Sequence, residues 1–124
     1  MVHASGPCSR QLPSFPVLEA VISILRDNAH VARVRIEGHT DNTGNERRNL
    51  ELSQRRGSSV RRWLIEHGVA QERLEAFGCG QNVALRMNNT EEGRQANRRV
   101  EFIIIDPPPP GRGHVVSDRC LPAD

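Results

Sequence analysis

The sequence predicts an α+β fold in which two main helices pack on one face of a mixed sheet containing a βαβ unit. Two observations carry this prediction: apolar residues recur at helical spacing in two segments, and short alternating runs between and after them favour strands. The order helix, strand, helix, strand, turn, strand requires a crossover connection. At 124 residues and 36% hydrophobic, the chain can bury one modest core.

The first helix is expected to start at Ser14 and to end near Asn28. Ser14 can cap it, and Pro16 suits the first turn because its missing N–H would be unpaired there anyway. The apolar residues follow the i, i+3, i+4, i+7 pattern of one buried face: Leu18, Val21, Ile22 and Leu25. The segment therefore predicts an amphipathic helix.

The next segment, residues 32–38, alternates apolar and charged side chains and predicts a half-buried strand. Val34 and Ile36 share one face, and the other face carries Arg33, Arg35 and Glu37. The strand then runs into the polar loop GHTDNTG at residues 38–44. Such an ending is compatible with catalysis, metal binding, a phosphate cradle or a plain turn.

A second helix is expected from about Glu46 to His67, with Gly68 as its C-cap. Its predicted apolar stripe runs through Leu52, position 56, Val60, Trp63 or Leu64, and His67. Position 56 is an arginine. A guanidinium at a half-buried position needs an anionic partner, because an unpaired buried charge is strongly destabilising.

Asp41, at the end of the preceding strand, is the natural partner of Arg56, and two interpretations remain open. In the first, the two residues form an ion pair that pins the loop. In the second, they flank a pocket for a zwitterion, with Asp41 receiving an ammonium and the bidentate fork of Arg56 gripping a carboxylate.

The rest of the chain predicts a short strand at residues 73–78, a loop rich in Gly and Asn, and a helical turn capped by Thr90. A last strand, 98–106, directs Val100, Phe102 and Ile104 inward. We therefore divide the chain into an irregular lead-in (1–13), a folded domain (14–106) and a Pro-rich disordered tail (107–124).

Composition excludes several classes of protein. The formal charge of +2 is too small for an electrostatic nucleic-acid binder, and no run of about 20 apolar residues exists to span a membrane. The three cysteines exclude a dense disulfide framework and a CxxC site, but one disulfide stays open, with Cys79 and Cys120 as the preferred pair. The N-terminal residues lack a secretory signal, so any export signal is expected outside this chain.

Two separated blocks resemble a known family. The first is GHTDNTG followed by Asn49, Leu52, Ser53 and Arg56, and the second is TEEGRQANRRVEF at residues 90–102. Together they resemble the OmpA C-terminal-like domain, over roughly residues 15–105. The family includes peptidoglycan-associated lipoproteins and the cell-wall domains of flagellar stators.

The resemblance implies non-covalent binding of peptidoglycan through the diaminopimelate residue of its stem peptide, without a cofactor. Asp41 and Arg56 would hold the amino acid end of that residue. Asn49 would hydrogen-bond the loop or ligand, Leu52 would contact the methylene stem, and Thr40 would shape the loop. Arg98 or Arg99 is expected to be structural. The setting implied is the periplasm, associated with the outer membrane only through a parent protein or anchor; a dimer is left open.

One departure from the family pattern matters. The family domain begins with a strand, but residues 1–13 do not read as that strand, so we expect it to be missing or degenerate. Either it lies upstream of this chain, or the sheet is one strand short with an exposed edge. This supports an alternative in which the domain is a degenerate assembly module that has lost its ligand.

Two further readings are weaker. The arginine-dense second helix could bind a polyanion or nucleic acid, but Glu46, Glu51 and Glu66 are interleaved with its arginines. The candidate metal ligands His39, Asp41, Glu46 and His67 lack metal-binding spacing, and no nucleophile motif is present. We therefore expect no metal site and no enzymatic activity.

Overall fold

The computed structural model describes residues 2–5, 14–107 and 119–123. For residues 2–5 it describes the backbone alone. The central elements are α1 (Phe15–Asp27), β2 (Arg33–His39), α2 (Glu46–Glu66), the short 3-10 helix η1 (Gln71–Arg73), β3 (Leu74–Gly80), α3 (Glu91–Asn97) and β4 (Arg99–Asp106). Two short strands, β1 (Val2–Ser5) and β5 (Leu121–Pro122), complete the set. The α+β fold class predicted from the sequence is confirmed.

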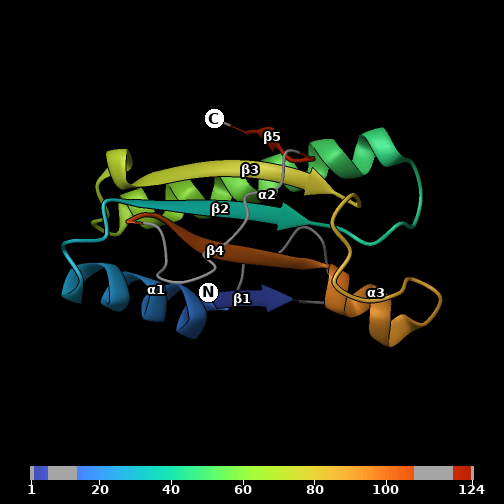
Figure 1. The fold of residues 1–124 in the computed structure, drawn as a ribbon, viewed down its shortest axis with the longest axis horizontal. Helices are drawn as coiled ribbons and strands as arrows, with labels where there is room; N and C mark the ends of the chain where they lie inside the picture. The colour runs from blue at the N-terminus through green and yellow to red at the C-terminus, as the bar shows by residue number, and fades with distance from the viewer. Residues whose placement is uncertain (1, 6–13, 108–118, 124) are drawn as a thin grey trace.

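The strands form one mixed sheet in the order β1-β4-β2-β3-β5 (Figure 1). Strands β2 and β3 are parallel and joined through α2, which is the predicted βαβ unit. Strand β4 runs antiparallel to both β2 and β1. The parallel strands therefore end, and β4 begins, at the same end of the sheet, where α3 also lies (Figure 1).

Helices α1 and α2 contribute to one hydrophobic core against the sheet. The core contains Leu18, Val21 and Leu25 of α1 together with Val60 and Leu64 of α2. The sheet contributes the apolar face predicted for its strands: Val34, Ile36, Leu74, Val100 and Phe102. The prediction that both main helices cover one face of the sheet is thus confirmed. Ser14 occupies the N-cap position of α1, but its side chain makes no capping hydrogen bond.

Helix α2 packs unusually close to the ends of β2 and β3 because the strands carry glycine there. A Cβ on Gly38 would collide with the backbone of Ser53, and one on Gly78 would collide with Gln54. The hydroxyl of Ser53 accepts a hydrogen bond from the backbone N–H of Gly80 at 2.8 Å. The first half of α2 is therefore fixed against the strand ends that lead into the candidate site.

The expectation of a missing first strand is wrong. Val2–Ser5 forms β1, which pairs with β4 in antiparallel register from Val2 opposite Phe102 to Ser5 opposite Arg99. Residues 1–13 are therefore not an irregular lead-in throughout, and β4 is not the sheet edge. This strand is only four residues long and has no apolar period, so it could not be identified from the sequence. Its stability comes from pairing with a neighbouring strand.

The expectation of a disordered tail is wrong for residues 119–123. Cys120 forms a disulfide with Cys79, the pair preferred from the sequence, and β5 pairs with β3. The backbone N–H of Ala123 donates to the carbonyl of Ala76 at 2.8 Å, and Gln54 donates to the carbonyl of Pro122 at 2.9 Å. The Pro-rich residues 108–118 lie outside the described residues.

The second face of the sheet carries buried charges rather than the solvated ones expected from the alternating pattern. We name these residues the sheet-face ladder: Arg35, Glu37, His39, Arg99 and Glu101, all buried. Arg35 donates to Glu37 at 2.7 Å, His39 Nε2 lies 3.2 Å from the other oxygen of Glu37, and Arg99 pairs with Glu101. Burial is tolerated because each carboxylate has an arginine partner on its own strand.

Candidate functional site

The residues predicted to form the site lie where β2 ends and α2 begins. The loop 40–45 connects the two elements, and its last residue, Asn45, caps α2 by accepting a hydrogen bond from the backbone N–H of Arg48 at 3.0 Å. Gly44 has φ +85°, a left-handed conformation that favours glycine. The polar loop ending that stood out in the sequence therefore brings the chain sharply from strand to helix.

Asp41 is buried and held by two donors. Its Oδ1 accepts from the backbone N–H of Thr43 at 2.8 Å, and its Oδ2 accepts from Arg98 at 2.5 Å. Burial alone would raise the pKa of Asp41, but the hydrogen bonds from Thr43 and Arg98 outweigh it, and the pKa is lowered. Asp41 is therefore an anion at neutral pH, as its proposed role requires.

Arg98, which precedes β4, joins the loop to α3. One nitrogen of its guanidinium donates to Asp41 and another donates to Oε1 of Glu91 at 2.7 Å. We name Asp41, Arg98 and Glu91 the loop cluster. From the sequence, Arg98 or Arg99 is expected to be structural, and the partnership of Arg98 with Asp41 was missed because 57 residues separate the two. The sequence signal was the pair Arg98–Arg99 at the start of the predicted last strand, and it does not distinguish the two arginines.

Arg56 is buried on the core side of α2, and its Nη1 donates to the carbonyl of His39 at 3.1 Å. It therefore reaches the backbone two residues before Asp41. The ion partner of Asp41 is Arg98, so the loop is pinned by a residue other than the one that the sequence suggested. Two cationic groups thus approach the same short loop from different elements.

The buried stripe of α2 differs in part from the prediction. Arg56, Val60 and Leu64 lie on it, and the remaining members are smaller or polar: Asn49, Ser53 and Gly57. Leu52 is only half-buried, and His67 is exposed at the C-cap, stacked on Trp63. The stripe is rotated because glycines in β2 and β3 let small residues of α2 approach the sheet.

Asn49 and Thr40 shape the loop. The amide nitrogen of Asn49 lies 3.3 Å from the carbonyl of Asp41, 3.1 Å from that of Thr43 and 3.2 Å from Oε1 of Gln81. The hydroxyl of Thr40 donates to the carbonyl of Asp41 at 2.8 Å. Leu52 lies one turn beyond Asn49 on the half-buried side of α2. These bonds hold the backbone of the loop and leave the orientation of Asp41 to Thr43 and Arg98.

Among the described residues, the sheet-face ladder is the arrangement that most resembles a metal site. Glu37, His39 and Glu101 place potential ligand atoms within 4.8 Å of one another. Both carboxylates are already neutralised by Arg35 and Arg99, so a dication would add uncompensated charge. The cysteines near Glu37 are joined in the disulfide. Of the four candidate ligands considered from the sequence, only His39 belongs to this group.

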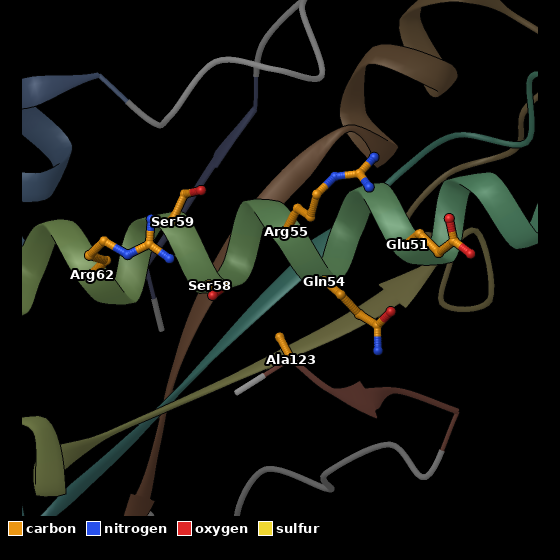
Figure 2. Close-up of a pocket in the computed structure, with 7 residues that line it drawn as sticks. All are labelled: Glu51, Gln54, Arg55, Ser58, Ser59, Arg62 and Ala123. Atoms are coloured by element: carbon orange, nitrogen blue, oxygen red, sulfur yellow. The ribbon is translucent and has the colours of Figure 1, made fainter.

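An open hollow of about 480 Å³ lies along the exposed side of α2 and reaches Ala123, next to the edge of the sheet where β5 pairs with β3 (Figure 2). It is lined by Glu51, Gln54, Arg55, Ser58, Ser59, Arg62 and Ala123. None of the residues predicted for the site lines this hollow. Within the described part of the chain, no helix combines the length and apolar character needed to cross a bilayer.

The fold and the site together define a class of protein: a small α+β module with a charged loop and helix at one end of a mixed sheet. The chain belongs to the OmpA family, whose model matches residues 14–98.

Several curated relatives share this region. The peptidoglycan-binding protein ArfA of Mycobacterium tuberculosis is 44% identical over 73 residues, which is 59% of this chain and 22% of ArfA. The outer-membrane lipoprotein YfiB of Pseudomonas aeruginosa is 42% identical over 74 residues, which is 60% of this chain and 44% of YfiB. The chain therefore corresponds to less than half of either relative.

Solved structures share the fold. The peptidoglycan-associated lipoprotein of Burkholderia pseudomallei has a TM-score of 0.73 at 24% identity, covering 82% of this chain and 88% of that one. The cell wall anchor of the T6SS from Pseudomonas aeruginosa has a TM-score of 0.64 at 29% identity, covering 77% of this chain and 71% of that one.

Proposed function

We propose that this chain binds peptidoglycan non-covalently through the diaminopimelate residue of its stem peptide and anchors an envelope protein to the cell wall. The observation that carries the proposal is the arrangement at the start of α2, where an ionised, buried Asp41 and the buried cation Arg56 meet at one short loop. The amino acid end of diaminopimelate carries an ammonium and a carboxylate, so the two residues offer one opposite charge to each.

The names of the relatives support this ligand class, because ArfA is described as peptidoglycan-binding and a structural neighbour as a cell wall anchor. The remaining predicted residues have compatible positions. Asn49 and Thr40 hold the loop backbone, and the half-buried Leu52 can offer an apolar surface to the methylene stem of the ligand.

We further propose an envelope location on the outer-membrane side of the periplasm. Curated relatives include outer-membrane porins and lipoproteins. The buried Cys79–Cys120 disulfide supports an oxidising compartment, since such bonds persist in the periplasm and are rare in the cytosol.

Two alternatives are less well supported. The degenerate assembly module depended on a missing first strand, and β1 occupies that position. A polyanion binder would use the arginines on the outer side of α2. Its binding would weaken steeply with salt, whereas recognition of diaminopimelate would depend on the type of cell wall.

The proposal is tested by co-sedimentation with purified sacculi, comparing walls with diaminopimelate against walls with lysine, which lacks the distal carboxylate. We expect the wild type to bind the first type and to bind the second much more weakly. Asp41→Ala and Arg56→Ala should each abolish binding, because each removes one of two charge contacts to a small ligand.

Arg55→Ala is the matched control, since it removes an exposed arginine from the adjacent position of the same helix. It should bind like the wild type. Circular dichroism checks that each variant is folded. Binding retained in folded Asp41→Ala and Arg56→Ala would overturn the site, and equal binding to both wall types would overturn the ligand.

A further inference from the structure

The loop cluster contains a cation already bound where an ammonium ligand would need to bind. Arg98 donates to Oδ2 of Asp41 at 2.5 Å, and Oδ1 of Asp41 is taken by the N–H of Thr43. The side chain of Asp41 is only 10% exposed, so access to its carboxylate is limited. An ammonium that approaches Asp41 must therefore compete with the guanidinium of Arg98.

Arg98 also has a second carboxylate partner, for which the ammonium would not compete. Glu91, in the first turn of α3, accepts from Arg98 at 2.7 Å, and its side chain is 63% exposed. The hydrogen bond to Arg98 is the main reason that the pKa of Glu91 is lowered. Its other oxygen lies 3.5 Å from Arg94. Glu91 thus neutralises part of the charge of Arg98 independently of Asp41.

The present position of Arg98 also leaves one donor unsatisfied. Its Nε is buried and has no hydrogen-bond partner among the described residues. A buried unpaired donor is destabilising, so a small outward movement of the guanidinium toward Glu91 and solvent would relieve this penalty. The same movement would free Oδ2 of Asp41.

We propose that Arg98 is a displaceable stand-in for the ammonium of the ligand, and that Glu91 is a positioning residue that retains Arg98 when the ligand takes its place on Asp41. The inference rests on the function proposed above and names two residues that act beyond the Asp41–Arg56 pair. In the absence of ligand, Arg98 keeps Asp41 ionised and oriented. With ligand bound, each of the two carboxylates has one cation.

Glu91 should therefore influence affinity without touching the ligand. In Glu91→Gln, Arg98 loses its second carboxylate and holds Asp41 more strongly against the incoming ammonium. We expect the affinity to fall by about threefold to tenfold, the range for a partly exposed charge-assisted pair. Because Glu91 acts only through Arg98, the effect should disappear when Arg98 is replaced.

The experiment is an isothermal or NMR titration of the full chain with a muramyl tripeptide that ends in meso-diaminopimelate. Glu92→Gln is the matched control, because it removes the same charge from the next, also exposed, position of α3. We expect Glu91→Gln to bind about threefold to tenfold more weakly and Glu92→Gln to stay within about twofold of the wild type. In the Arg98→Gln background, adding Glu91→Gln should change nothing further.

A second probe carries an acetyl group on the distal amine and so has no ammonium. The Glu91→Gln and wild-type proteins should bind this probe alike, a comparison that remains valid even if Arg98→Gln fails to fold. Equal effects of Glu91→Gln and Glu92→Gln, or an effect of Glu91→Gln that persists with the blocked probe, would overturn the inference. Failure of the wild type to bind the free-amine probe would instead overturn the proposed function itself.

Discussion

The sheet-face ladder and the loop cluster are built from the same chemistry, buried arginine–carboxylate pairs, but they differ in how the pairs are closed. In the ladder, each arginine meets a glutamate two residues away on its own strand: Arg35 with Glu37, and Arg99 with Glu101. In the loop cluster, Arg98 joins residues from two different elements, and Glu91 reaches solvent. Buried charge alone therefore does not identify a binding site, and in our proposal the distinguishing feature is a partner that can be exchanged.

Removing one arginine from each region should show the largest difference in stability between the two. Arg99 is 2% exposed in its ion pair with Glu101 and also donates to the carbonyl of Val83 at 3.1 Å. Arg99→Ala would leave Glu101 buried without its partner, so we expect a loss of about 3–5 kcal/mol in the free energy of unfolding. Urea denaturation followed by circular dichroism measures it.

Arg98→Ala is the matched variant, one residue away in the chain. Asp41 would keep its bond from Thr43 and Glu91 would remain solvated, so we expect a smaller loss of about 1–2 kcal/mol. Equal losses in the two variants would show that the regions do not differ in the way described.

The disulfide offers a second, somewhat smaller effect. Cys79 and Cys120 are 41 residues apart and lie beside Glu37, on the ladder side of the sheet. Replacing both by alanine should lower the free energy of unfolding by about 2–4 kcal/mol, because the unfolded chain regains the entropy that the crosslink removed.

The same double variant tests whether the disulfide also influences ligand binding at the loop cluster. The loop cluster is held by its own bonds to Thr43 and Asn49, so the affinity for the diaminopimelate muropeptide should be preserved. Loss of binding in a variant that is still folded would mean that the two regions are coupled. Reduction of the wild type with dithiothreitol should reproduce the stability loss.

The smallest expected effect is a difference in pH dependence. Burial, opposed by Glu37, lowers the pKa of His39, so its folded-state pKa lies below the ordinary value of 6.5. The unfolded chain then binds the proton more readily, and stability is lost as the pH falls from about 6.5 through the folded-state pKa. His39→Gln should flatten the stability profile in this range.

Asp41 acts at lower pH. Its folded-state pKa lies below the ordinary value of 3.8, so its contribution is present above that value and is lost as the pH falls through the folded-state pKa. Asp41→Asn should therefore change the profile only in the acid range and leave the part near pH 6 intact. If Asp41→Asn changed the profile near pH 6 and His39→Gln changed it in the acid range, the electrostatic description of both regions would be contradicted.

The sequence predicted the parts of the fold that carry their own periodicity. Helices α1 and α2 and the apolar faces of β2 and β4 follow from the spacing of a few residues such as Leu18 and Val34. Strands β1 and β5 were missed because each is short and gains its stability from a neighbouring edge. The burial of Arg35 and Glu37 on the second face of β2 was not predicted, because alternation indicates two faces and does not reveal that both are buried.

The candidate site, like the fold, could be predicted only in part from the sequence. Asp41, Arg56, Asn49, Leu52 and Thr40 come from one continuous block of sequence, and their roles as ligand contacts remain a prediction. Arg98 and Glu91 could not be connected to Asp41 in the same way. Their contact depends on how α3 and β4 are placed beside the loop, which is a tertiary feature without a local sequence pattern.

The two outermost strands come from the two ends of the chain and lie outside the span shared with the family. A protein trimmed to residues 14–106 would keep β4 but lose β1 and β5, which would leave the outer edge of β4 and the Phe77–Gly78 part of β3 with unpaired backbone groups. The unpaired backbone groups of an exposed strand edge can form hydrogen bonds with a strand of another molecule. The terminal strands therefore cover backbone groups that could otherwise pair with another molecule, and we expect the shortened chain to self-associate while its helices remain folded.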